Sequence, residues 1–143
     1  MSEGRPAKAR TRRGYRGVRA VDPDSGQETT AFVSYDKIDA TARFRSRGQV
    51  LELAHLVPDA LARPQAVFRG VREEAERRWL CYVGRRSRAF HPDGTERTPY
   101  PGEVFLVFVT DQMVVYNWNW FEADEQDAAL PRDHADRFSE RLL

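Results

Sequence analysis

Four segments of alternating side chains constrain the fold of this chain more than any other feature. They are residues 66–73, 77–84, 103–110 and 113–120. Each is rich in β-branched and aromatic residues, and alternation with a period of two is typical of β-strands. Asp111 and Gln112 leave only a short connection between the last two segments, which predicts a tight hairpin. The sequence therefore predicts an antiparallel meander of four or more strands.

A short strand is expected over residues 29–35, and helices are expected before and after the meander in the chain. Apolar residues at helical spacing predict a helix over residues 46–56, ended by Pro58 because proline cannot donate a hydrogen bond to the preceding turn. Residues 58–61 are expected to form one more helical turn, with the proline at its first position. Phe138 and Leu142 lie four residues apart and predict a C-terminal helix over residues 132–142. The expected fold class is α+β, with an N-terminal helix, a four-stranded or larger antiparallel sheet and a C-terminal helix packed on that sheet.

Length and composition narrow the class of protein. A chain of 143 residues is expected to form one domain. Residues 1–18 are polar and basic and predict a disordered tail, which leaves residues 19–143 as a single α+β domain. No apolar run approaches the ~18 residues of a membrane span, so we expect a cytoplasmic protein without a membrane partner. The single cysteine, Cys81, excludes an internal disulfide and is expected in the core.

A long basic connection between the second and third segments is the first candidate site. Such a connection is uncommon in a compact domain without a functional reason. Guanidinium groups bind phosphate in a bidentate manner, and histidine is suited to proton transfer near neutral pH. The candidate residues of this loop are Arg85, Arg86, Arg88, His91, Arg97 and Tyr100. We expect His91, Arg85 and Arg88, together with Tyr116 of the fourth segment, to be catalytic. The residues expected to bind the substrate are Arg86, Arg69, Arg72, Tyr100, Asn117, Asn119 and Trp118.

The fourth segment carries the second candidate site. Tyr116, Trp118 and Trp120 alternate with Asn117 and Asn119, a pattern that suits base stacking combined with hydrogen bonds to base edges. In the alternative interpretation, the two tryptophans belong to the core and the asparagines face water. No cluster of histidine, cysteine or carboxylate residues has a trusted ligand spacing, and no nucleotide-binding motif is present. Neither a metal nor another cofactor is therefore expected.

The order of these elements resembles the barnase–EndoU–colicin–RelE-like nuclease superfamily, which includes RelE- and ParE-type toxins. The resemblance covers residues 46–121 and includes a first strand that follows Pro64. It implies RNA cleavage without a metal ion, RNA as a partner and a cognate antitoxin as another. The residues nearest in role to those of the family are Arg69, Arg72, Arg85, Arg86, Arg88, His91 and Tyr116.

The leading hypothesis is a metal-independent endoribonuclease of a bacterial toxin-like module. The ribose 2′-hydroxyl would attack the adjacent phosphate, His91 would transfer a proton, and Arg85, Arg86 and Arg88 would hold the phosphate. Tyr116 and Asn117 would position the nucleotide. One alternative is a non-catalytic protein- or ligand-binding module that uses the aromatic segment and the basic loop. Another is an antitoxin or immunity protein whose acidic C-terminal segment neutralises a basic partner.

Overall fold

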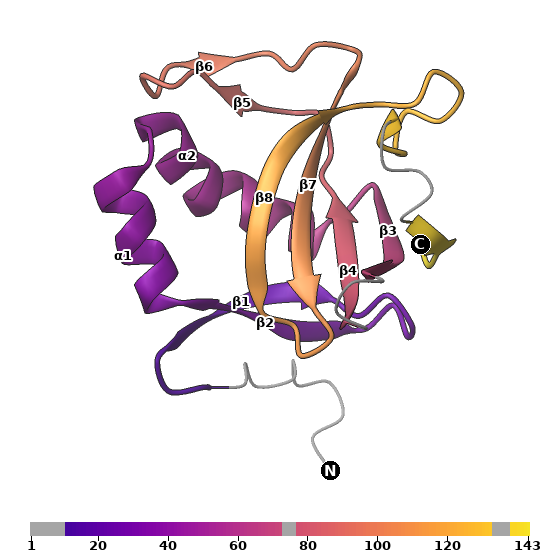
Figure 1. Cartoon of the computed structure of the whole chain (residues 1–143), viewed down its shortest axis with the longest axis horizontal. Helices are drawn as coiled ribbons and strands as arrows, with labels where there is room; N and C mark the ends of the chain where they lie inside the picture. The colour runs from indigo at the N-terminus through magenta and orange to yellow at the C-terminus, as the bar shows by residue number, and fades with distance from the viewer. Residues whose placement is uncertain (1–10, 73–76, 133–137) are drawn as a thin grey trace.

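The computed structural model describes residues 11–72, 77–132 and 138–143 (Figure 1). The chain begins with a β-hairpin, continues through a run of helices, and then forms the main sheet. The hairpin strands are β1 (Tyr15–Val21) and β2 (Glu28–Ser34). The helical run consists of α1 (Tyr35–Phe44), α2 (Arg47–Leu51), the π-helical turn η1 (Glu52–Leu56) and α3 (Val57–Ala62).

The main sheet is antiparallel and has five strands in the order β8-β7-β4-β3-β9. Its strands are β3 (Ala66–Arg72), β4 (Arg77–Val83), β7 (Glu103–Thr110), β8 (Val115–Glu122) and β9 (Phe138–Arg141). The four expected segments are therefore neighbours as β3, β4, β7 and β8. The basic connection is not wholly irregular, because β5 (Ala89–Phe90) and β6 (Glu96–Arg97) form a small hairpin within it.

The two faces of the sheet carry separate cores. On one face, Tyr82 packs with Leu61 of α3 in what we call the helix-side core. On the other face, Cys81 and Leu106 pack with Ala129 in the C-terminal-side core. Cys81 and Tyr82 point in opposite directions because neighbouring side chains of a strand alternate between the faces. Cys81 is fully buried, and desolvation raises the pKa of its thiol well above the ordinary value.

The expected fold class is wrong in the placement of its helices. The structure has strands first, and β1 already begins at Tyr15, inside the range expected to be a tail. The helix expected over residues 132–142 is replaced by β9, although residues 133–137 lie outside the described part of the chain. The open edge of β3 pairs with β9 and satisfies its backbone groups. One apolar pair at helical spacing was too weak a signal to outweigh this tertiary pairing.

Pro58 does not end the helix that precedes it. The helical run continues through Pro58 to Ala62 because the turn before the proline widens into η1. There the Val57 N–H donates to the carbonyl of Glu52, five residues earlier. A proline ring clashes with the carbonyl four residues before it in an ordinary α-helix, and a wider turn relieves that clash.

The β1–β2 hairpin closes one end of the main sheet. The Tyr82 hydroxyl donates to the Val21 carbonyl at 2.6 Å, and the Phe32 N–H donates to the Met113 carbonyl at 2.8 Å beside the start of β8. The chain then turns away from β8, because Ser34 caps α1 by accepting the Lys37 N–H. Beyond this point the outer edge of β8 faces α1 and α2 instead of another strand (Figure 1). No helix in the described residues has the length and apolar character needed to span a membrane.

Candidate nucleic-acid interface

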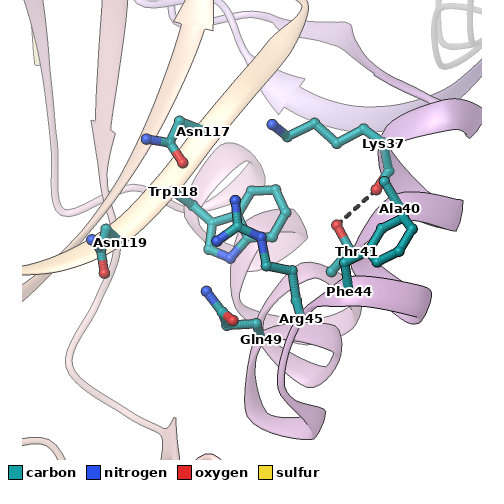
Figure 2. Close-up of a pocket in the computed structure, with 9 residues that line it drawn as sticks. All are labelled: Lys37, Ala40, Thr41, Phe44, Arg45, Gln49, Asn117, Trp118 and Asn119. Atoms are coloured by element: carbon teal, nitrogen blue, oxygen red, sulfur yellow. Dashed lines mark hydrogen bonds between the residues drawn. The ribbon is translucent and has the colours of Figure 1, made fainter.

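An open cleft lies between the edge of β8 and the corner formed by α1 and α2 (Figure 2). Its volume is about 470 Å³. We call it the amide–cation cleft, because cationic and carboxamide side chains dominate its lining. The lining residues are Lys37, Ala40, Thr41, Phe44, Arg45, Gln49, Asn117, Trp118 and Asn119. The lining contains no acidic residue, so the charge of the cleft is positive.

Two cations from the helical side provide this charge. The Lys37 ammonium donates to the Tyr116 carbonyl on the open edge of β8 and lies 5.5 Å from the centre of the Trp118 ring. Arg45 follows the last residue of α1 and makes no ion pair with any residue that the structure describes. Desolvation lowers the pKa of Lys37, and the nearby positive charge of Arg45 lowers it further. An anionic ligand would relieve the repulsion between these two groups.

Three carboxamides share the cleft with the cations. Asn117 and Asn119 are exposed on β8, and Gln49 reaches toward the cleft from α2 (Figure 2). The Gln49 side-chain oxygen accepts the Ser46 N–H at 3.2 Å, which completes the capping box of α2. The Asn119 oxygen accepts the Trp120 N–H at 2.9 Å. Both oxygens are thereby engaged, and the amide nitrogens remain as donors toward the cleft.

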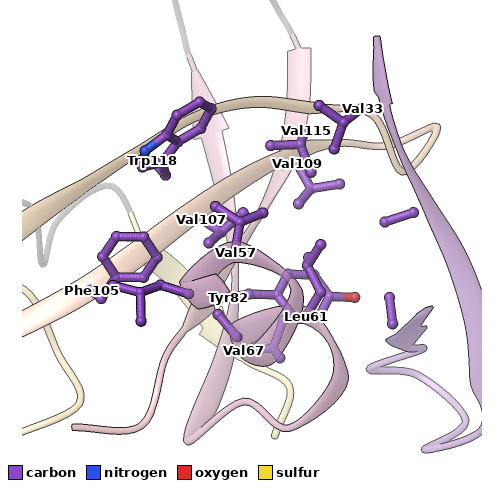
Figure 3. Close-up of a cluster of buried hydrophobic side chains, with 14 of the residues drawn as sticks. Val33, Val57, Leu61, Val67, Tyr82, Phe105, Val107, Val109, Val115 and Trp118 are labelled. Carbon is purple, nitrogen blue, oxygen red and sulfur yellow. The ribbon is translucent and has the colours of Figure 1, made fainter. Parts of the chain in front are cut away.

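The aromatic groups differ greatly in exposure. The Trp118 side chain is only 8% exposed and packs with Phe105 and Val107 in the helix-side core (Figure 3). Phe44, by contrast, is 81% exposed at the end of α1. A large apolar side chain with that exposure, beside two cations, is available to stack on a flat ligand. Trp118 therefore supports the cleft from below, and Phe44 is the accessible ring.

A buried carboxylate lies behind the cleft. Glu52 is 7% exposed and accepts the Trp120 indole N–H at 3.0 Å. Desolvation raises the pKa of Glu52, and hydrogen bonds from Trp120 and Trp118 partly offset that rise. Arg97 lies 5.3 Å from the Trp120 ring centre and pairs with Glu103 at 2.7 and 3.0 Å. This network joins η1 and the β5–β6 hairpin to β8.

The Glu52→Gln variant should become more stable relative to the wild type as the pH rises from about 4 to 8. Because the pKa of Glu52 is raised in the folded protein, its protonated carboxyl stabilises the folded state at pH values below the unfolded-state pKa. That contribution is lost as the pH rises through the folded-state pKa. Glutamine does not ionise, and its oxygen still accepts the indole N–H. Urea unfolding at several pH values measures the difference.

The Glu103→Gln variant is the matched control and should show the opposite trend. A hydrogen bond from Arg97 lowers the pKa of Glu103, so its contribution is present above the unfolded-state pKa and is lost as the pH falls. Parallel pH trends for the two variants would contradict the assignment.

The three loop arginines expected to hold phosphate make structural contacts. Arg85 and Arg86 donate to backbone carbonyl groups. Arg88 forms an ion pair with Glu96 at 2.5 Å and lies over the Phe90 ring. These contacts hold the β5–β6 hairpin and the turns beside it. They do not direct the guanidinium groups into the amide–cation cleft.

His91 lies at the tip of the β5–β6 hairpin, which rests on α2. The Gly48 N–H of α2 donates to the Pro92 carbonyl at 3.1 Å. The side chain of Arg47 lies directly against Gly94 in the same turn. The His91 side chain is exposed. Its turn is bonded to Gly48, which directly precedes Gln49 of the cleft. Of the expected catalytic residues, His91 is therefore the one whose turn contacts the helices of the cleft.

Tyr116 is not brought together with His91. Its ring packs 6.1 Å from that of Phe108 in the C-terminal-side core, on the face of the sheet opposite the helices. Tyr100 is 66% exposed near Arg97, outside the cleft lining.

The first-strand arginines are also distant from the cleft. Arg69 lies on β3 and pairs with Asp24 and Glu140. Three strands of the sheet, β4, β7 and β8, lie between β3 and α1. Arg72 ends β3, and its side chain lies outside the described part of the structure.

The structure brings Asn117, Trp118 and Asn119 into one site, together with residues that the sequence did not single out. The missed residues are Lys37, Thr41, Phe44, Arg45, Gln49 and Glu52. A signal for some of them was present, because Ser46 and Gln49 have the spacing of a capping box. Nothing in the local sequence indicates that α1 lies beside β8. Among the described residues, no group of histidine, cysteine or carboxylate side chains is arranged to hold a metal ion.

No family model, curated protein or solved structure matches this chain. The resemblance to RelE-like nucleases, and the antitoxin and protein-binding alternatives, therefore stay predictions.

Proposed function

We propose that this chain binds single-stranded RNA in the amide–cation cleft. The observation that carries the proposal is the cleft lining itself. Lys37 and Arg45, neither of which has an acidic partner among the described residues, face the carboxamides of β8 and α2. Cations that are not neutralised within the protein favour an anionic ligand, and carboxamides favour a ligand with both donors and acceptors.

The phosphate group of the ligand is assigned to the two cations. Arg45 offers a planar fork of donors that matches a phosphate, and Lys37 adds a compact charge. Lys37 is held at the strand edge by the Tyr116 carbonyl, which leaves its other ammonium hydrogens as donors. The lowered pKa of Lys37 arises from burial and from Arg45, and a bound phosphate would favour the charged ammonium again.

The bases are assigned to Phe44 and the carboxamides. Base stacking on an exposed aromatic ring stabilises single-stranded RNA complexes by about 1–3 kcal/mol per base. The amide nitrogens of Gln49 and Asn119 can donate to a base edge, which is accessible only when the base is unpaired. A double helix keeps these edges paired, so the chemistry of the cleft favours a single strand.

The Lys37→Ala and Arg45→Ala variants should each bind a short oligouridylate about tenfold more weakly, because each loses a phosphate contact. The slope of log affinity against log salt should fall by about 0.7 for each variant. Fluorescence anisotropy with a labelled oligonucleotide measures both quantities.

Arg43→Ala is the matched control, since Arg43 lies on the same helix but pairs with Asp39 and does not line the cleft. It should retain wild-type affinity within about twofold. Equal losses for Arg43→Ala and Arg45→Ala would refute a defined site and leave only a general effect of net charge.

Cleavage of the bound RNA is the second candidate function. The observation that favours it is the contact between the His91 turn and α2, together with the exposure of the His91 side chain. In such a reaction the 2′-oxygen forms a bond to phosphorus while the bond from phosphorus to the 5′-oxygen breaks. The 2′-hydroxyl loses a proton and the 5′-oxygen gains one, and we assign one of these transfers to His91.

A further inference from the structure

We infer that the bound strand extends beyond the amide–cation cleft along α1 to the first residues of β1. The ligand is then an oligonucleotide of several nucleotides instead of a mononucleotide. This inference depends on the proposed function and specifies the length and path of the RNA. It rests on how the cations of the described residues are divided between two parts of the molecule.

Arginines with neither an acidic residue nor a backbone carbonyl as hydrogen-bond partner are confined to one part of the described chain. After residue 62, every arginine whose side chain is described donates either to an acidic residue or to a backbone carbonyl. Before that point, five arginines have no such partner among the described residues. They are Arg12, Arg13, Arg16, Arg45 and Arg47. Lys37 also has no acidic partner among these residues, although it donates to the Tyr116 carbonyl. We call these six residues the cationic track.

The members of the track lie on neighbouring elements. The Tyr35 N–H at the start of α1 donates to the Gly14 carbonyl at 3.0 Å, so the first turn of α1 lies against the start of β1. Arg13 adjoins Gly14 in the chain, and Lys37 lies two residues beyond Tyr35. At the other end of α1, Arg45 leads directly into α2. The track therefore follows α1 from the start of β1 to the turn that holds His91 (Figure 1).

Exposed aromatic rings lie at both ends of α1, on opposite sides of the helix because nine residues separate them. Tyr35 is 56% exposed and Phe44 is 81% exposed. They occupy the first and last positions of α1, a helix of ten residues, which spans about 15 Å. The Arg12 guanidinium also lies 4.3 Å from the Tyr15 ring centre. Rings and cations spread over that length match an extended strand better than one nucleotide.

One of the two acidic residues of α1 is neutralised within the described part of the protein, and the other is not. Asp39 is neutralised by Arg43 at 3.4 Å. Asp36 lies in the first turn of α1, where a negative charge is stabilised by the helix dipole. It is exposed, and its charge opposes RNA at that point of the path. Asp36→Asn should therefore tighten the binding of a long strand.

The test compares a dinucleotide with an oligouridylate of about 10 nucleotides, each titrated against the full chain and the Arg12→Ala/Arg16→Ala variant. We expect the variant to bind the long strand about tenfold more weakly, with a salt slope reduced by about 1.4. Its affinity for the dinucleotide should stay within about twofold of wild type. Arg19→Ala is the control, because Arg19 lies on the same strand but pairs with Glu28 at 2.5 Å.

The failure of this inference is distinguishable from that of the proposed function. If both ligands depend on Lys37 and Arg45 but neither responds to the Arg12→Ala/Arg16→Ala change, the track is refuted and the cleft stands. An Arg19→Ala effect as large as that of the double variant would also refute the track. If neither ligand binds the wild type, both the track and the proposed function are overturned.

Discussion

The His91→Ala variant is expected to lose metal-independent RNA cleavage by at least about 100-fold while keeping its affinity for RNA. Removal of a positioned acid–base group usually costs about 10²–10⁴-fold in rate. His91 is exposed at a hairpin tip that contacts α2 through the Pro92 carbonyl, and it does not line the cleft. Proton transfer should therefore be lost without loss of binding. Cleavage of a labelled oligonucleotide in the presence of EDTA measures the rate, and anisotropy measures the affinity.

His55→Ala is the matched control for this experiment. His55 is also exposed, and its ring centre lies 6.3 Å from that of Phe90 in the same hairpin. The substitution removes an imidazole from the same region without touching the His91 turn, and cleavage should be unchanged. If the wild type leaves RNA intact, or if His91→Ala cleaves as fast as wild type, the assignment of proton transfer to His91 is wrong. The cleft would then be a binding site only.

Replacing Gly48 with alanine is expected to destabilise the fold by about 2 kcal/mol, because inserting atoms into a packed contact costs about 1–3 kcal/mol. A β-carbon at this position would lie 2.3 Å from the His91 carbonyl oxygen and 3.0 Å from its carbonyl carbon. Both atoms belong to the backbone, so no side-chain rotation relieves the clash. The hairpin must move away from α2, and the hydrogen bond from the Gly48 N–H to Pro92 is lost.

The expected loss of stability is opposite in sign to the usual effect of this substitution in a helix. In an unobstructed helix, glycine to alanine is stabilising by about 1 kcal/mol, so a loss of stability requires the contact with His91. Gly102→Ala is the control, since a β-carbon there meets no atom within 4 Å. Urea unfolding measures both variants, and amide exchange reports on the Gly48 N–H. A Gly48→Ala protein that is as stable as wild type, and whose backbone amide at the substituted position is protected from exchange, would contradict the position of the hairpin.

The strands were predictable because their signal is local. Each of β3, β4, β7 and β8 alternates along its own sequence, and β7 is apolar on both faces because it lies between β8 and β4 with a core on each face. Helix boundaries were predicted less well. The spacing of apolar residues after Ser46 indicated a helix, and Pro58 indicated the start of a further helical turn. That the two join into one run depended on a π-helical turn that no pattern of side chains predicts.

The residues of the candidate site also divide into those that the local sequence indicates and those that only the fold brings together. Asn117 and Asn119 stood out because carboxamides alternate with aromatic residues on one strand. The cations that accompany them could not be inferred, since Lys37 meets the Tyr116 carbonyl across 79 residues of sequence. The loop arginines misled for a related reason. Arg85, Arg86 and Arg88 have the right chemistry for phosphate, but each donates to a carbonyl group or a carboxylate of the fold.

By itself, the sequence determined the strand segments, the buried cysteine and the presence of exposed carboxamides on the last long strand, because these follow from alternation along a short segment. Only the tertiary structure decided that β1 pairs with β2 ahead of the helices, that the C-terminal segment pairs with β3, and that α1 lies beside the edge of β8. Those outcomes depend on which backbone edges remain unpaired after the main sheet has formed. The amide–cation cleft exists because β2 leaves that edge at Ser34, where the cap of α1 begins.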